Sequence, residues 1–310
     1  MATITAKDVA ELRAKTGAGM MDCKKALVEA DGDVEKAVKI LREKGLATAA
    51  KKESRIAAEG IVDILVKDGV AAIIEVNTET DFVAKNEMFR DFVTGLLETI
   101  IANKPASVEA LAQLGFRGTA QTVEAALTEK IAMIGEKISI RRFEVVEGTT
   151  STYIHGAGTT GVIVKFTTDV DTASAAFAEF AKNIALQLAA GNPPQYVNIE
   201  DVPQAAIDEE KSVLVAQAKN DPKNANKPEA ILEKMVMGRL GKFYERVCLV
   251  EQPYVKDDDL TVGKYVAATA KELGGSIKIT GFYRFEKGEG IEKKEEDFAA
   301  EIAKLAGGQK

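Results

Sequence analysis

An internal repeat constrains this sequence more than any other feature, because one amphipathic helical pattern occurs twice, 88 residues apart. In the first copy, apolar residues recur at helical spacing from Phe89 to Ile101, and a proline follows four residues later. In the second copy the same pattern runs from Phe177 to Ala189, and a proline follows at the same distance. Apolar positions match apolar positions throughout, so the repeat predicts two units with the same local fold.

Strand patterns precede both helices. Before the first helix, the runs Ile61–Val66 and Val70–Val76 enclose Lys67-Asp68-Gly69, which is a hairpin signal. Before the second helix, Tyr153-Ile154 and Val162–Phe166 enclose a glycine-rich turn. Each copy therefore predicts a hairpin followed by a helix. This arrangement is typical of an α+β fold, here with two small antiparallel sheets.

A closing motif follows each helix, and its spacing locates an insertion. The pattern Arg-Phe-Glu-x-x-Glu-Gly occurs at 142–148 and again at 284–290, so the offset grows from 88 to 142 residues. The second copy thus carries 54 extra residues between its helix and its closing strand. Helical patterns at 205–219 and at 228–242, separated by a polar turn, predict an antiparallel helical hairpin. We expect this hairpin to serve as a structural arm or as a subunit contact.

The connection between hairpin and helix is also longer in the first copy. When Gly69 is aligned with Gly161, the offset is 92, which leaves about four extra residues within 77–86. This run encloses Phe82 among polar residues, as expected of a loop tip. The alternative is that Asp81 caps the helix and Phe82 packs into the core. The shorter connection in the second copy argues against that alternative.

The N-terminal segment predicts three short helices over residues 1–45. Thr5 and Asp33 are typical helix-capping residues, and Gly45 is placed to end the third helix. The segment 46–58 is rich in alanine and charge, and it predicts a helical or flexible connector. Residues 1–54 carry 11 basic and 9 acidic side chains, a balance of +2. Their lysine pairs form either a solvated face or a weak docking surface for an acidic partner.

Composition argues against several classes of function. Lysine and arginine number 41 against 48 acidic residues, and the net charge of −7 argues against a protein that mainly grips nucleic-acid phosphates. The single histidine, His155, cannot form a histidine-rich metal site or a proton relay. Cys23 and Cys248 form no CxxC motif, so neither a disulfide framework nor a zinc site is expected. We therefore expect a protein that is not an enzyme and that holds no metal and no cofactor.

The sequence also carries no membrane signal. No apolar run reaches the roughly 18 residues that a membrane-spanning helix needs. The N-terminus alternates charged and apolar residues and lacks the pattern of a signal peptide. These features predict a cytoplasmic protein without a membrane partner.

Two motifs give the chain a family resemblance. Thr16–Leu27 (TGAGMMDCKKAL) and Thr80–Asn86 (TDFVAKN) resemble the two signatures of the elongation factor Ts family, the guanine nucleotide exchange factors for the GTPase elongation factor Tu. Segments 154–157 and 288–293 are similar to further parts of the family pattern, so the resemblance covers essentially the whole chain. It implies elongation factor Tu as the partner, GDP release and exchange for GTP in translation elongation as the activity, and no direct binding of nucleic acid.

The resemblance also implies a domain organisation. The N-terminal helices are similar to a ubiquitin-associated (UBA) domain, the repeats become two subdomains of one core, and the inserted hairpin becomes a coiled coil. Homodimer contacts through the core or the arm are left open. The expected boundaries are 1–54 for the N-terminal module and linker, 55–148 for the N subdomain, 149–202 with 246–285 for the C subdomain, 203–245 for the arm, and 286–310 for a C-terminal helical module.

The family segment that dislodges Mg²⁺ from the partner GTPase matches four residues here, which are Thr80, Asp81, Phe82 and Val83. Phe82 is suited to act as an aromatic wedge that enters a pocket of the partner. Asp81 beside it is suited to compete for the hydrogen bonds that order the Mg²⁺ shell. The resemblance therefore implies that this loop carries the exchange activity.

Partner binding is expected at Leu12, Met20, Met21 and His155. The first three offer apolar side chains for a helix of the partner. Alternatively, Leu12 and one of the two methionines close the core of the three-helix module. His155 lies beside glycines in the second hairpin, where it is either a partner contact or an ordinary turn histidine.

Overall fold

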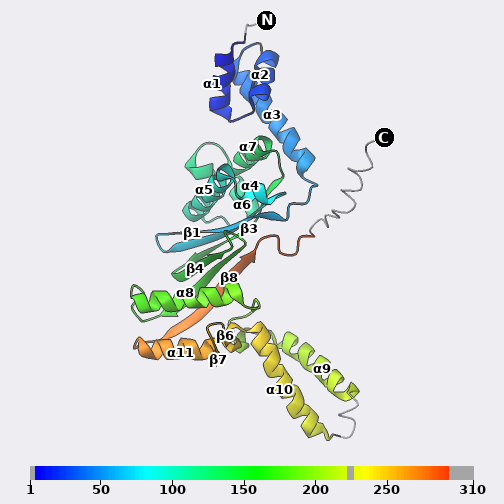
Figure 1. The fold of residues 1–310 in the computed structure, drawn as a ribbon, viewed down its shortest axis with the longest axis vertical. Helices are drawn as coiled ribbons and strands as arrows, with labels where there is room; N and C mark the ends of the chain where they lie inside the picture. The colour runs from blue at the N-terminus through cyan, green and yellow to red at the C-terminus, as the bar shows by residue number, and fades with distance from the viewer. Residues whose placement is uncertain (1–3, 222–226, 293–310) are drawn as a thin grey trace, which may run out of the picture. The chain divides into compact units, whose positions relative to one another are not determined.

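The computed structural model describes residues 4–221 and 227–292 (Figure 1). The described part combines helices with small sheets, so the expected α+β class is confirmed. The chain divides into two compact units. The first unit comprises Met1–Asp63, Ile74–Phe143 and Glu286–Lys310, and the second comprises Ile64–Ile73 and Glu144–Phe285.

Three helices open the first unit, α1 (Ala6–Thr16), α2 (Met20–Glu29) and α3 (Val34–Lys52). Thr5 caps α1 through a reciprocal pair of hydrogen bonds with Asp8, and the Asp33 side chain caps α3. Their shared core consists of small and medium apolar residues, Val9, Leu12, Cys23, Ala26, Leu27, Ala30 and Ala37. The expectation of three N-terminal helices is confirmed, whereas their kinship to a UBA domain stays a prediction.

The expected end of the third helix at Gly45 is wrong, because α3 continues through Gly45 to Lys52. Helix α3 packs against α7 (Val123–Ile134). A Cβ atom on Gly45 would make ordinary van der Waals contacts, 3.6 Å from Ala132 Cβ and 3.7 Å from Thr128 Cγ2. Gly45 is thus a buried interior residue of α3 on the side that faces α7, and it does not end the helix.

The first sheet has the strand order β1-β2-β3, with β1 (Glu59–Lys67), β2 (Val70–Thr78) and β3 (Ile138–Glu147). Asp68 and Gly69 join β1 to β2, both with positive φ, as a tight two-residue hairpin turn requires. Between β2 and β3 lie α4 (Asp81–Ala84), α5 (Glu87–Asn103), α6 (Val108–Ala112), the 3₁₀ turn η1 (Phe116–Gly118) and α7. Helix α5 buries the apolar face that the repeat predicted, including Phe89, Phe92 and Leu96.

The second sheet has the order β4-β5-β8, with β4 (Thr149–His155), β5 (Thr160–Thr168) and β8 (Ile277–Glu286). Strands β4 and β5 pair antiparallel, from Thr149 opposite Phe166 to His155 opposite Thr160. Helix α8 (Ala175–Ala190) packs on both of these strands. A small ribbon of β6 (Pro253–Tyr254) and β7 (Asp257–Thr261) then leads into α11 (Val262–Glu272) and β8.

The inserted segment forms the expected helical hairpin. After the 3₁₀ turn η2 (Ile199–Asp201), α9 (Gln204–Asn220) and α10 (Glu229–Val247) pack together, and η4 (Leu249–Glu251) returns the chain to the second sheet. The two helices share an apolar core that includes Leu214, Val236, Leu240 and Phe243. The description of this arm as a coiled coil stays a prediction.

The repeat is more extensive in the structure than in the sequence. The first residues of β2 and β5 are 90 positions apart, and those of α5 and α8 are 88 positions apart. Helices α7 and α11, which the pattern analysis did not pair, begin 139 positions apart, as do strands β3 and β8. Thr122 and Thr261 cap these two helices in the same way. Each copy therefore consists of a hairpin, a helix, a second helix and a closing strand.

Two sequence alignments need correction against these offsets. The Arg-Phe-Glu motif lies in the middle of β3 but at the end of β8, so its offset of 142 does not describe equivalent positions. The connection between hairpin and helix has eight residues in the first copy (79–86) and six in the second (169–174). The first copy is thus longer by two residues rather than four, because Gly69 and Gly161 are not equivalent turn positions.

Two further expectations concern the ends of the chain and the membrane. The predicted C-terminal helical module (286–310) lies, from residue 293 on, outside the described residues. Within residues 4–221 and 227–292, no helix combines the length and the apolar character needed to cross a membrane. The domain boundaries expected from the sequence stay predictions, because the two compact units do not test them.

Candidate functional site

The loop between β2 and α5 presents Phe82 to solvent. The Phe82 side chain is 80% exposed, whereas its neighbours Val83 and Ala84 are buried. These residues form the single turn α4, whose N-cap residue is Thr80 and not Asp81. The alternative in which Asp81 caps a helix and Phe82 packs into the core is therefore wrong. An exposed aromatic ring on a buried base is the geometry expected of a protruding contact residue.

Asp81 lies on the solvent side of the same turn. Its carboxylate accepts a hydrogen bond from Lys85 Nζ at 2.6 Å, and the Lys85 side chain is largely exposed while that of Asp81 is about half exposed. This hydrogen bond to Lys85 lowers the pKa of Asp81 below its usual range. The carboxylate is thus negatively charged and partly exposed next to Phe82.

Two acidic residues brace the start of this loop. Glu136, in the turn between α7 and β3, accepts hydrogen bonds from the Thr80 backbone N–H at 3.0 Å and from the Thr80 hydroxyl at 2.6 Å. Glu79 accepts from the Lys137 backbone N–H at 2.6 Å and pairs with Arg55 at 3.2 Å. Two consecutive residues before α4, Glu79 and Thr80, are therefore both held by charge-assisted hydrogen bonds.

The far end of the loop is also fixed. The Asn86 side chain caps α5 by accepting from the Met88 N–H at 2.8 Å, and the Asn86 N–H donates to the Val83 carbonyl at 2.9 Å. Arg90 Nε donates to the Ala84 carbonyl at 3.2 Å. Phe82 thus protrudes from a short segment whose backbone is anchored before and after it.

The predicted partner-binding residues of the N-terminal module fall into two groups. Met20 and Met21 are 46% and 64% exposed at the start of α2. Leu12 is only 1% exposed and lies in the core of the module. The structure thus favours the core role for Leu12, because its side chain has no surface to offer a partner. Leu12 instead supports the helices that present the two methionines.

His155 is the last residue of β4, directly before the turn to β5, in the second unit. Gly156, Ala157 and Gly158 all adopt positive φ, which makes this a tight and irregular turn. The His155 ring is exposed, and its Nδ1 lies 3.3 Å from the Tyr153 hydroxyl. The ring is accessible, and its role in partner binding stays a prediction.

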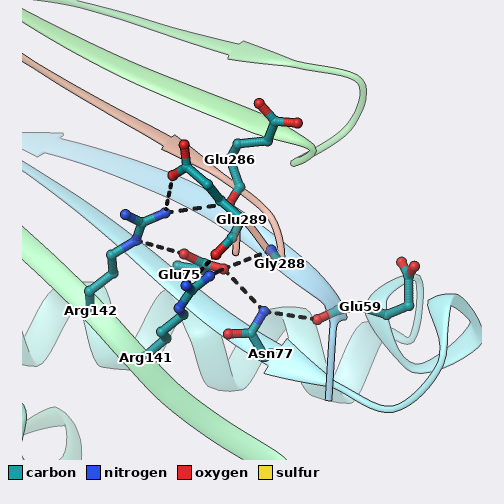
Figure 2. A network of polar contacts seen from close by, with 8 residues as sticks. All are labelled: Glu59, Glu75, Asn77, Arg141, Arg142, Glu286, Gly288 and Glu289. Carbon is teal, nitrogen blue, oxygen red and sulfur yellow. Dashed lines mark hydrogen bonds and ion pairs between the residues drawn. The ribbon is translucent and has the colours of Figure 1, made fainter. Parts of the chain in front are cut away.

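A polar network that the sequence analysis missed lies on the same strand that leads into the loop. The Glu75 side chain of β2 is fully buried, and its carboxylate is surrounded by donors (Figure 2). Arg141 Nη1 donates at 2.9 Å, Arg142 Nε at 2.7 Å, Asn77 Nδ2 at 3.1 Å and the Gly288 N–H at 2.8 Å. A buried carboxylate requires such pairing, since the charge would otherwise be strongly unfavourable.

This network holds the segment after β8 against the first sheet. Arg141 also donates to the Glu289 carbonyl, and Arg142 Nη2 lies 3.0 Å from Glu289 Oε2. Gly288 approaches so closely that a Cβ atom there would lie 2.2 Å from the Ala58 carbonyl oxygen. The sequence did carry a signal, because Glu75 interrupts the apolar run from Val70 to Val76.

The described residues offer no obvious metal site. Among residues 4–221 and 227–292, no group of three or more His, Cys, Asp or Glu side chains is placed to hold a metal ion. Both cysteines are buried and free, and burial raises the pKa of Cys248 to about 11.

Fold and loop together define a class: a duplicated α+β protein with an N-terminal helical module, an inserted helical arm and one exposed aromatic residue on a braced turn. Residues 79–289 match the family model described as Elongation factor TS. Elongation factor Ts of Clostridium botulinum (strain Alaska E43 / Type E3) is 50% identical over 309 residues, covering 98% of this chain and 99% of the relative. Elongation factor Ts of Syntrophotalea carbinolica is 47% identical over 305 residues, covering 97% and 99%. This chain belongs to the elongation factor Ts family, as the two signature motifs indicated.

Proposed function

We propose that this protein is a guanine nucleotide exchange factor that binds the GDP form of elongation factor Tu and promotes the exchange of GDP for GTP in translation elongation. Membership of the elongation factor Ts family supports the choice of partner and of activity. The observation that carries the mechanism is the 80% exposure of Phe82 on a turn whose two ends are anchored.

Phe82 supplies the apolar part of the proposed contact. Because the ring is almost fully exposed in the free protein, nearly all of its surface is available for burial against the partner. Burying roughly 150–200 Å² of apolar surface at about 25 cal/mol per Å² contributes about 4 kcal/mol. This energy promotes exchange only if the pocket that receives the ring is better formed when the nucleotide is loosely held.

Asp81 supplies the polar part. In a GTPase the nucleotide is held by contacts to its phosphates and by Mg²⁺, whose shell includes positioned water molecules. A carboxylate beside the inserted ring competes for the hydrogen bonds that order this shell. We infer that Thr80, Asp81, Phe82 and Val83 act together to dislodge Mg²⁺ from the partner, with Val83 anchoring the turn.

This mechanism requires no acid, base or nucleophile in the exchange factor, which acts by binding and not as an enzyme. The two equilibria are coupled reciprocally: if the factor weakens GDP binding by a given ratio, GDP weakens binding of the factor by the same ratio. Excess GTP over GDP then sets the direction of net exchange.

Met20, Met21 and His155 supply further contacts in the proposal. Methionine side chains adapt to the surface they meet, and both methionines are exposed at the start of α2. We assign them to affinity for the partner, and we leave Leu12 out of this surface because it is buried.

The test is the release of a fluorescent GDP analogue from elongation factor Tu, followed by stopped flow. The substitution Phe82→Ala is expected to lower the stimulated rate about 100-fold, because the apolar contact is lost while the anchored backbone remains. Val66→Ala, at another exposed apolar side chain, is the matched control and is expected to keep full activity. Unchanged stimulation by the Phe82 variant would rule out the wedge.

A further inference from the structure

The turn Gly135–Lys137, which connects α7 to β3, has an equivalent in the second copy of the repeat at 274–276. In the first copy the Lys137 N–H donates to Glu79 Oε1 at 2.6 Å. In the second copy the Ser276 N–H donates to Asp169 Oδ1 at 2.5 Å. Both pairs occupy matching positions in the repeat, so this bond belongs to the shared scaffold and not to the function of one copy.

The neighbouring position of the turn differs between the copies. Glu136 accepts from the Thr80 N–H and hydroxyl. In the second copy the equivalent residues are Gly275, which has no side chain, and Val170, which has no hydroxyl and whose N–H donates to Thr168 Oγ1 at 3.2 Å. A Cβ atom on Gly275 would lie 2.4 Å from Asp169 Oδ1 and 2.7 Å from Val170 Cγ1. The second copy has no room for a side chain where the first places a carboxylate, so the Glu136 contact occurs only beside the Phe82 loop.

Phe82 itself contributes little to holding its turn. An 80% exposed ring has few packing partners, and the Thr80 side chain makes no capping bond to α4. The direction in which α4 begins therefore depends on how the Thr80 backbone is fixed. The Thr80 N–H and hydroxyl both donate to the Glu136 carboxylate, and these charge-assisted bonds hold Thr80 more strongly than neutral bonds would. The Thr80 carbonyl also accepts a neutral bond from the Thr78 hydroxyl at 2.9 Å.

The turn that carries Glu136 is itself firmly held. Lys137 Nζ donates to the carbonyls of Glu53 and Arg55 at 2.6 and 2.9 Å. Lys52 at the end of α3 donates to the Gly135 carbonyl. The backbone that carries Glu136 is thus held in place, as it must be if the carboxylate is to orient another residue.

We propose that Glu136 is a positioning residue for nucleotide exchange: by holding Thr80, it sets the orientation of α4 and the presentation of Phe82 to the partner. This inference rests on the proposed function of the Phe82 loop. Glu136 contributes no contact of its own with the partner, so its loss lowers the efficiency of insertion more than the affinity of the complex.

The first experiment measures stimulated GDP release over a range of exchange-factor concentrations. Glu136→Ala is expected to lower the maximal rate about 10-fold, as the loss of hydrogen bonds to a charged group predicts. The half-saturating concentration is expected to change by less than about two-fold, since affinity is supplied elsewhere. Glu136→Gln, which keeps one acceptor oxygen, is expected to restore part of the rate.

Glu129→Gln is the matched control, because Glu129 lies on α7 and its carboxylate accepts a hydrogen bond from Gln121 Nε2 at 2.8 Å, away from Thr80. It is expected to keep the wild-type rate and the wild-type thermal midpoint. A Glu136→Ala rate equal to that of the Glu129 variant overturns the proposal, as does a loss that appears only as weaker half-saturation.

The second experiment repeats Glu136→Ala in the Phe82→Ala background. If Glu136 acts through Phe82, the second substitution causes no further loss, and an equally large loss in both backgrounds overturns the proposal. The two hypotheses fail in different ways. An active Phe82→Ala variant contradicts the proposed function, whereas an inactive Phe82→Ala with a fully active Glu136→Ala contradicts the positioning role alone.

Discussion

The two copies of the repeat keep the same frame and differ in the loop that joins hairpin to helix. Eight residues (79–86) make this connection in the first copy and six (169–174) in the second. Both following helices begin at equivalent positions, with side-chain caps from Asn86 and Ser174. The longer connection is accommodated in α4, which exposes Phe82, and not by moving the helix. A duplicated scaffold can thus gain a protruding loop in one copy without altering its packed elements.

The copies also differ in how they use one strand position. Glu75 of β2 and Lys165 of β5 are 90 positions apart and equivalent in the hairpins, yet Glu75 is fully buried and Lys165 is exposed. In the first copy this position holds the segment around Gly288 through the network in Figure 2. The second copy places only a solvated charge there. The same strand position is therefore buried where two arginines and the segment around Gly288 surround it, and solvated where they are absent.

The most severe test makes the first copy resemble the second. Replacing residues 79–86 by the sequence Asp-Val-Asp-Thr-Ala-Ser of 169–174, together with Glu136→Gly, should keep the fold and remove the Phe82 loop. Since the wedge and its charged neighbour are lost together, stimulated GDP release should fall about 1000-fold, corresponding to about 4 kcal/mol of contact energy.

The control for this chimera is circular dichroism with thermal unfolding, in which the chimera should show the helix content of the wild type and a similar thermal midpoint. A chimera that folds and still accelerates GDP release would mean that the difference between the copies is not the functional one.

The next test concerns the buried network. Glu75→Ala removes the carboxylate but leaves Arg141 and Arg142, whose side chains are 29% and 32% exposed. Because these cations remain partly solvated, we expect a loss of about 3 kcal/mol, at the low end for breaking a buried ion pair. Lys165→Ala, at the equivalent position, should change stability by less than about 0.5 kcal/mol.

Urea denaturation measures the free energy of unfolding of both variants. Since the chain has no tryptophan, unfolding is followed by tyrosine fluorescence or circular dichroism. Equal losses for Glu75→Ala and Lys165→Ala would show that the buried network contributes no more than a surface charge.

Much of this architecture follows from the sequence. The apolar spacing of α5 and α8 predicted the repeat, and the offset between copies located the helical arm. These features are local and periodic, so they can be predicted from the sequence without a structure. The exposed position of Phe82 was anticipated for a related reason, because the second copy makes the same connection with fewer residues.

The bracing of the loop was not predictable in the same way. Glu136 and Thr80 are 56 residues apart, and Glu75 and Gly288 are 213 residues apart. Such contacts depend on which strands become neighbours, and residue type alone does not reveal them. The prediction that Gly45 ends the third helix was wrong for a related reason, since α3 continues through Gly45 where it packs against α7, a contact that the local sequence does not reveal.

The subtlest test addresses the bond that both copies share. The hydrogen bond from the Ser276 N–H lowers the pKa of Asp169 below its usual range. A carboxyl whose pKa is lowered on folding contributes stability that is fully present above its unfolded pKa and is lost as pH falls through the lowered, folded value. Wild type should therefore be slightly more stable than Asp169→Asn at neutral pH, and this advantage should vanish in acid, below the ordinary range of aspartate.

Thermal midpoints recorded from neutral pH to about pH 2, where ordinary carboxyls are protonated, measure this difference directly. Asp258→Asn, at an exposed position in β7, should show no such convergence with wild type. The bond to Asp169 orients the turn in the second copy, which does not carry the Phe82 loop. Asp169→Asn should therefore leave stimulated GDP release unchanged, while Glu136→Ala lowers it. If both substitutions lowered the rate alike, the distinction between a scaffold bond common to the copies and a positioning bond confined to the first would not hold.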